Sequence, residues 1–284
     1  MDTKLTGKTR IESDLIGARE IPAEALYGVQ TLRGIENFSI SKFRLSEYPL
    51  FIKGLAITKM AAAMANFELG LLTVEQKDAI IAACGEIIDG KHHDQFPVDM
   101  IQGGAGTTTN MNANEVIANR ALELMGHERG EYQYCSPNDH VNCSQSTNDA
   151  YPTAIHIGMY FKHLQLLPHL EELIASFRKK GEEFSRIIKM GRTQLEDAVP
   201  MTLGQTFNGF ASILQDEIAH LNEAAADFLV VNMGATAIGT GICAEPGYAE
   251  KCIAALREIT GWDIRLSSDL VGATSEDRKS TRLN

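Results

Sequence analysis

Two long stretches of helical hydrophobic periodicity restrict the folds that this 284-residue chain can adopt. In residues 154–190 and again in residues 203–233, apolar side chains recur at the spacing of one helix face. The polar segment 191–202 between them carries Gly191 and Pro200, which predict a turn. We therefore expect two antiparallel helices of about 30 residues each, which are long enough to need packing partners on more than one side.

Shorter helices are expected before this pair. Residues 50–69 are rich in Ala and Met, which have high helix propensity. Thr73 and Gln76 have the spacing of a capping box, so a second helix should begin there and end near Gly90. A third helix is expected over residues 112–125.

The remaining segments complete the expected organisation. Residues 1–48 mix short apolar pieces with turn residues, and residues 246–260 predict one more helix. The expected fold class is mainly α, with a mixed N-terminal domain over residues 1–145 and the first part of a long-helix bundle domain over residues 146–276. The polar residues 277–284 look foreign to the rest, and we interpret them as a non-native tail.

Composition excludes several classes of function. The net charge of −11 without a Lys/Arg cluster argues against nucleic acid or an anionic membrane as a partner. The chain has no run of 18 apolar residues, and Met1–Lys4 does not open a signal peptide, so we expect a cytoplasmic protein. The cysteines and His92-His93 lack the spacing of a metal site. We therefore expect neither a metal ion nor a cofactor.

Three polar segments next to predicted helices carry the functional signal. Residues 142–153 and 103–116 combine Ser, Thr, Asn and Gly, and residues 191–200 form a third segment of the same kind. Free N–H groups and the positive dipole end at a helix start bind anions. The simpler interpretation of each segment is a capped turn, because Ser, Thr, Asn and Asp are ordinary capping residues. Three such segments together favour a composite site for a small, doubly charged acid.

The same segments resemble, in order, the three substrate-binding regions of the fumarase/aspartase superfamily. The resembling stretches are Gly103-Gly104-Ala105-Gly106-Thr107 through Asn112, Ser144-Gln145-Ser146-Thr147-Asn148-Asp149, and Gly191-Arg192-Thr193 with Pro200 through Gln205. Residues 25–31, 95–99 and 131–134 are similar to the aspartase branch of this superfamily. The resemblance runs from about Arg10 to about Ser275.

This resemblance implies reversible elimination of ammonia from L-aspartate to give fumarate. Thr107, Ser146 and Thr147 match the positions that hold the carboxylate next to the proton-losing carbon. Asn148 and Thr193 match positions near the leaving amine. Donors aimed at that carboxylate help because its charge increases as the carbon loses its proton.

Gln194 also belongs to the implied substrate site. Fumarase-like members usually carry His at this position, since a leaving hydroxide needs a proton. An amine leaves as neutral ammonia, and a glutamine can orient it without titrating. Thr206 stands where the family usually has Glu. A fumarate hydratase and a non-catalytic helical scaffold remain the alternatives.

The serine base of the family lies in a Gly-Ser-Ser loop that this sequence does not contain. We therefore assign no catalytic residue within the chain and interpret it as an N-terminal fragment, inactive by itself. The resemblance also implies a homotetramer, because the active sites of the family are assembled from several subunits.

Overall fold

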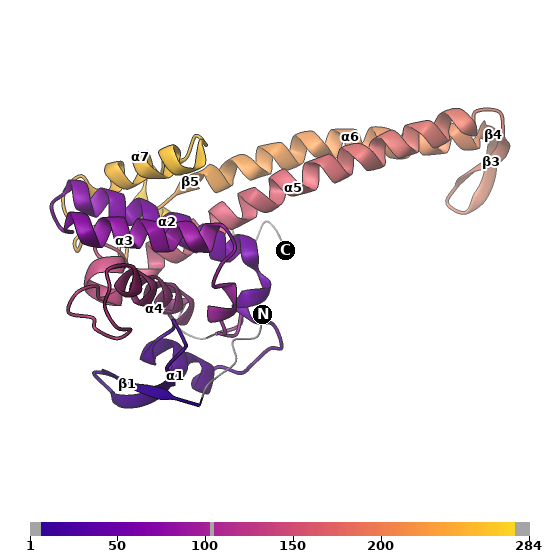
Figure 1. Ribbon diagram of the computed structural model, residues 1–284. Coiled ribbons are helices and arrows are strands. Elements are labelled where there is room, and N and C mark those ends of the chain that lie inside the picture. Colours follow the sequence, from indigo (N-terminus) through magenta and orange to yellow (C-terminus); the bar gives the residue numbers. More distant parts are fainter. Residues whose placement is uncertain (1–6, 103–104, 276–284) are drawn as a thin grey trace. The chain divides into compact units, whose positions relative to one another are not determined.

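The computed structural model describes residues 7–102 and 105–275 and is mainly α-helical, which confirms the predicted fold class (Figure 1). Gly103, Gly104 and the expected foreign tail 277–284 lie outside the described residues. The chain divides into two compact units, Tyr160–Phe228 and the segments on either side of it.

The first unit contains most of the helices. Its N-terminal elements are β1 (Thr9–Asp14), β2 (Gly17–Pro22), α1 (Val29–Asn37), η1 (Leu45–Glu47), α2 (Pro49–Glu68), α3 (Val74–Ile88), η2 (His93–Gln95), α4 (Thr107–Leu124) and the π-helix η3 (Pro137–Val141). The start of α5 (Thr147–Glu183) follows, and β5 (Val230–Val231), α7 (Tyr248–Thr260), β6 (Arg265–Leu266) and α8 (Leu270–Ser275) complete the unit. Strands β1 and β2 pair antiparallel, whereas β5 and β6 pair parallel.

Helix α2 forms the centre of this unit and packs against α3, α4 and α7. The core around it contains Leu55, Ile80, Ile87, Ile117 and Leu122, all nearly inaccessible to solvent. Within the described part of the chain, α2 alone is long and apolar enough to cross a membrane, but 67% of that window is buried. Because it is buried on several sides, α2 is the central core helix of a folded unit.

Helix α2 and the first turns of α5 cross at glycines. A Cβ added at Gly54 would lie 2.3 Å from the carbonyl oxygen of Ala154, and one at Gly158 would lie 3.1 Å from that of Leu50. Contacts this short leave no room for a side chain. The two small residues therefore fix how closely the start of α5 approaches α2.

Residues 25–31, one of the three segments that resemble aspartases, are bound by the buried carboxylate of Glu115 on α4. Glu115 accepts hydrogen bonds from the backbone N–H groups of Gly28, Gln30 and Thr31 and from the Thr31 hydroxyl. These donors are the free N–H groups at the start of α1. Burial raises the pKa of Glu115, and these hydrogen bonds oppose the shift. The motif thus anchors α1 to α4.

The other two aspartase-like segments, residues 95–99 and 131–134, also form hydrogen bonds that stabilise the fold. The Gln95 side chain accepts from the backbone N–H of Leu26, and the Tyr132 hydroxyl donates to Glu12. Asn119 of α4 donates to the carbonyl of Leu26. These bonds hold the N-terminal segment on the surface of α4.

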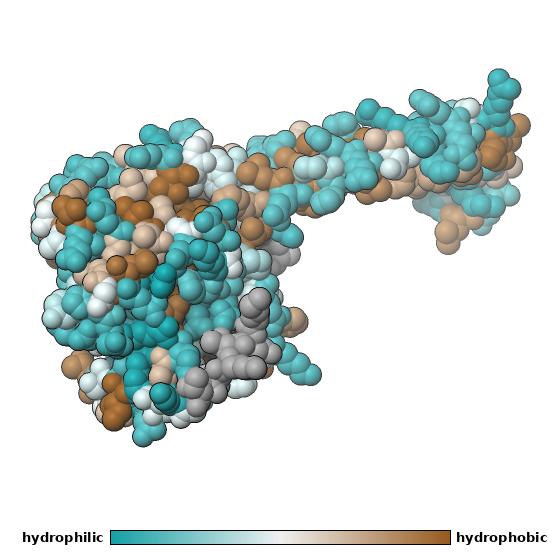
Figure 2. Space-filling view, viewed as in Figure 1, coloured by the Kyte–Doolittle hydropathy of each residue, from teal (hydrophilic) through white to brown (hydrophobic). Residues whose placement is uncertain are grey.

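The second unit is a helical hairpin formed by the rest of α5, β3 (Ile188–Thr193), β4 (Glu196–Thr202) and α6 (Leu203–Ala226). The helices are antiparallel as predicted, because Phe177 packs against Phe207 and Phe210 while His163 bonds Asn222. Several large apolar side chains of this unit remain exposed, and Figure 2 shows apolar surface along α5 and α6. The exposed residues include Leu164, Leu166, Leu173, Phe210 and Ile213 on the helices, and Ile188, Leu195 and Val199 in the β3–β4 hairpin.

The predicted ends of the two long helices are wrong. Helix α5 ends at Glu183, and residues 188–190 belong to strand β3, which pairs with β4. Helix α6 ends at Ala226, and residues 230–231 form β5. Short apolar runs fit either periodicity, so the strands were not distinguishable from helix. The capping box of Thr73 and Gln76 and the helix over most of 246–260 are confirmed.

We predict that Gly54→Ala lowers the free energy of unfolding by about 1–3 kcal/mol, because the methyl group overpacks the α2–α5 crossing. Gly85→Ala on α3 is the matched control, since a Cβ there meets nothing within 4 Å. The control should raise stability by about 1 kcal/mol through helix propensity. Urea unfolding of both variants measures the two free energies of unfolding. Equal changes in the two variants would contradict the close contact between α2 and α5 at Gly54.

Candidate functional site

The first polar segment opens helix α4. Gly106 caps the helix with φ 85, and Thr107 is the first helical residue. A Cβ at Gly106 would lie 2.7 Å from the ring of Tyr151, so both the backbone angle and the space require glycine. The helix predicted over 112–125 therefore begins earlier, at Thr107. The run of threonines, which are weak helix formers, hid this start.

The second polar segment opens helix α5 at Thr147, not at residue 154. The Ser146 hydroxyl accepts from the backbone N–H of Asn148 at 3.2 Å, and Asp149 accepts from the backbone N–H of Ser146 at 3.0 Å. These two bonds cap the helix start, with Ser146 accepting from the second helical residue and Asp149 accepting from Ser146. The capped-turn interpretation therefore describes the local structure of this segment correctly, and a binding role would be additional to it.

The starts of α4 and α5 meet. Asn110, in the first turn of α4, donates from Nδ2 to the hydroxyl of Thr147 at 3.1 Å. Thr107 lies three residues before Asn110, on the same face of the helix. Thr107, Ser146 and Thr147 therefore occupy two adjoining helix N-termini. The positive ends of both helix dipoles favour an anion at this place in a protein of net charge −11.

A buried polar network lies behind the two helix starts. Asn142 Oδ1 accepts from Lys59 Nζ at 2.9 Å, from Asn110 Nδ2 at 3.1 Å and from Asn114 Nδ2 at 3.2 Å. Lys59 Nζ also donates to Gln145 Oε1 at 2.8 Å. Lys59 is fully buried, and burial lowers its pKa to about 7.

Lys59 was not among the site residues predicted from the sequence. It is one of two lysines in the Ala- and Met-rich stretch 50–69, where a buried charge needs partners.

The loop that follows β5 holds the start of α5 from another side. Asp149 accepts from the backbone N–H of Thr236 at 2.8 Å, and Asn148 Nδ2 donates to the carbonyl of Ala237 at 2.7 Å. Asn232 donates to the carbonyl of Asn148. Asp149 is buried, which raises its pKa to about 6. No sequence pattern linked this loop to the polar segments.

The remaining expected site residues belong to the second unit. Thr193 ends strand β3, and Gln194 lies in the turn before β4 with φ 49. Both side chains are exposed. The structure thus brings Thr107, Ser146, Thr147 and Asn148 together in the first unit and places Thr193 and Gln194 in the hairpin of the second.

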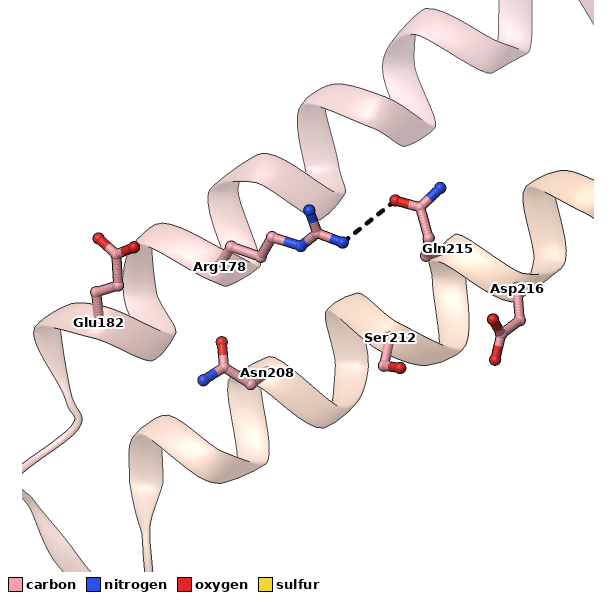
Figure 3. A pocket seen from close by; sticks show the side chains of 6 residues that line it. All are labelled: Arg178, Glu182, Asn208, Ser212, Gln215 and Asp216. Atoms are coloured by element: carbon pink, nitrogen blue, oxygen red, sulfur yellow. Dashed lines mark hydrogen bonds between the residues drawn. The ribbon is translucent and has the colours of Figure 1, made fainter.

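An open groove in the second unit is chemically different from this site. It lies between α5 and α6 and is lined by Arg178, Glu182, Asn208, Ser212, Gln215 and Asp216 (Figure 3). Arg178 donates to Gln215 at 3.3 Å, and the charges along the groove are of both signs. Among residues 7–102 and 105–275, no group of three or more His, Cys, Asp or Glu side chains is placed to hold a metal ion.

Comparison with known proteins identifies the family. A family model described as lyase matches residues 17–281. An aspartate ammonia-lyase of Pseudomonas canavaninivorans is 56% identical over 268 residues, which cover 94% of this chain and 56% of the relative.

Two solved structures are similar in fold. The cobalt-bound crystal structure of fumarate lyase:delta crystallin from Brucella melitensis has a TM-score of 0.94 at 51% identity, over 96% of this chain and 59% of that chain. A class II fumarase from Schistosoma mansoni has a TM-score of 0.87 at 34% identity, over 94% of this chain and 59% of that chain.

The chain therefore belongs to this lyase family, the fumarase/aspartase superfamily, which confirms the resemblance drawn from the three polar segments. It spans a little more than half the length of these relatives, with 56% of the aspartate ammonia-lyase covered.

We predict a pH-dependent effect of Asp149→Asn. Because the folded state raises the pKa of Asp149 to about 6, its stabilising contribution is complete below about pH 4 and is lost as the pH rises through 6. The excess stability of the unmodified protein over the variant should fall by roughly 3 kcal/mol across this window. Urea unfolding at several pH values measures this difference, in which the titrating groups that do not interact with Asp149 cancel. A difference that grows with pH would contradict the burial of this carboxyl.

Proposed function

We propose that the complete protein containing this chain is an aspartate ammonia-lyase, which eliminates ammonia from L-aspartate to give fumarate. The observation that carries this proposal is the meeting of the α4 and α5 N-termini, with the hydroxyls of Thr107, Ser146 and Thr147 on their first turns. Identity of 56% to an aspartate ammonia-lyase, against 34% to a fumarase, supports ammonia over water as the leaving group.

The proposed chemistry needs hydrogen-bond donors more than reactive groups. A base removes a proton from Cβ of aspartate, and the electron pair spreads into the neighbouring carboxylate as a dianionic enediolate. The pair then forms the carbon–carbon double bond as the C–N bond breaks and ammonia leaves. Donors and helix dipoles directed at the carboxylate favour the dianion over the ground state, which lowers the barrier. We assign this role to Thr107, Ser146 and Thr147.

The amine side of the proposed site uses acceptors. Asn148 donates from Nδ2 to Ala237, so its Oδ1 is the atom suited to accept a hydrogen bond from the substrate ammonium. We propose, as the family resemblance implies, that Thr193 and Gln194 also contribute to substrate binding in the complete protein. Gln194 has no proton to give to a leaving hydroxide, which disfavours the fumarate hydratase alternative.

We also propose that the complete protein is a cytoplasmic homotetramer, that residues 1–145 and 146–276 belong to different domains, and that residues 277–284 are not native. Support for assembly comes from exposed apolar side chains of the second unit, such as Leu195, Phe210 and Ile213. An exposed apolar surface of this kind typically marks a protein interface.

In the complete protein, Ser146→Ala and Thr147→Val should each lower kcat by about 100- to 1,000-fold while changing KM little. The removed hydroxyl is expected to donate a hydrogen bond to the carboxylate as its charge increases. One such donor lowers the activation free energy by about 2.7–4 kcal/mol. Steady-state kinetics of fumarate formation together with the melting temperature measure both effects.

The matched control for these variants is Thr73→Ala at the capping box of α3. It should cost about 1 kcal/mol of stability and leave kcat unchanged. If Ser146→Ala and Thr147→Val behave like this control, the start of α5 is a structural cap only.

The 284-residue chain by itself should form no fumarate from aspartate and should associate in solution. The exposed apolar faces of α5 and α6 would then be covered by other copies. An absorbance assay for fumarate tests the first statement, and sedimentation velocity tests the second. Fumarate formation would contradict the first, and a monodisperse monomer the second.

A further inference from the structure

Lys59 is the most unusually placed charged side chain of the first unit. It lies on α2, the central core helix, and has 0% of its surface exposed. Burying an ammonium group is costly unless hydrogen bonds compensate for its lost hydration. Lys59 obtains this compensation from two amide oxygens, those of Asn142 and Gln145.

No carboxylate is paired with this ammonium among the described residues. The titratable groups whose charges act on Lys59 are Asp149 of α5, Cys84 of α3 and Cys252 of α7. Burial has the largest effect on its pKa, which falls to about 7. The side chain is therefore kept in the core by its bonds to the segment before α5 rather than by an ion pair.

Both acceptors of Lys59 lie immediately before the start of α5. Gln145 directly precedes Ser146, and its side chain also donates to the carbonyl groups of Val141 and Cys143, which tightens the turn. Asn142 accepts from α4 as well, through Asn110. One buried side chain of α2 thus bonds to the residues that set where α5 begins relative to α4.

We propose that Lys59 is a positioning residue for the proposed reaction: through Asn142 and Gln145 it holds the hydroxyls of Ser146 and Thr147 at the first turn of α4. The inference rests on the proposed function. Lys59 is inaccessible to solvent and does not touch the substrate, so it acts only through the geometry of the segment it holds.

Loss of the hydrogen bonds from Lys59 should lower the reaction rate. A displacement of about 1 Å in catalytic donors can cost about 100-fold in rate. Lys59→Met keeps a long apolar side chain of similar reach but removes both hydrogen bonds. In the complete protein it should lower kcat by about 100-fold and change KM by less than about fivefold, with helical circular dichroism unchanged.

The matched control is Thr58→Val on the same helix. Thr58 is equally buried, and among the described residues its hydroxyl bonds within α2, to the carbonyl of Gly54. This variant also removes a buried hydrogen bond but leaves the segment before α5 untouched. Its kcat should stay within about twofold of the unmodified protein, whatever happens to its melting temperature.

A double-mutant cycle tests the route of the effect. If Lys59 acts through Gln145, then Gln145→Leu lowers kcat similarly, and combining it with Lys59→Met adds little more. The proposal is overturned if the double variant lowers kcat by the product of the two single effects. A normal kcat in a folded Lys59→Met protein overturns it as well. Should Lys59→Met fail to fold, Gln145→Leu carries the test, and a normal kcat in that variant overturns it.

Hydrogen exchange separates this inference from the proposed function. If the unmodified protein forms no fumarate from aspartate, the proposed function fails, but positioning is still measurable. Lys59→Met should then raise amide exchange at residues 146–150 at least tenfold, whereas Thr58→Val should leave it unchanged. Equal exchange in both variants overturns the role of Lys59.

Discussion

The arrangement of the first unit depends on one amide oxygen. Asn142 Oδ1 accepts hydrogen bonds from Lys59 of α2 and from Asn110 and Asn114 of α4. It thereby ties the central helix and the first turns of α4 to the segment from which α5 starts. The hydrogen bonds of this buried network favour one geometry, although Oδ1 of Asn110 and Oδ1 of Asn114 have no hydrogen-bond partner among the described residues. Here that geometry places two helix N-termini side by side and provides a favourable place for a carboxylate.

The fold was predictable wherever the signal was local. The capping box at Thr73 sets the start of α3 through bonds within a few residues, and it was recognised in the sequence. Strands β3 and β4 were not, because their pairing joins residues across a turn and their apolar side chains also fit a helix. Tertiary contacts of this kind leave little trace in periodicity.

The candidate site was predictable as a set of residue types but not as a structure. Ser, Thr and Asn beside glycine indicated anion binding, and Thr107, Ser146 and Thr147 do lie at helix starts. The support behind them was missed, since Lys59 and Asp149 resemble ordinary charged residues in the sequence. Their burial depends on partners about 80 residues away or more, such as Asn142 for Lys59 and Thr236 for Asp149.

The central claim is that the joined N-termini of α4 and α5 bind a carboxylate. The most direct test is a crystal structure of the complete protein with bound succinate, a dicarboxylate that cannot lose ammonia. The account predicts one carboxylate within hydrogen-bond distance of the hydroxyls of Thr107, Ser146 and Thr147, at about 2.5–3.0 Å. Succinate bound elsewhere, with these hydroxyls still engaged only as caps, would contradict it.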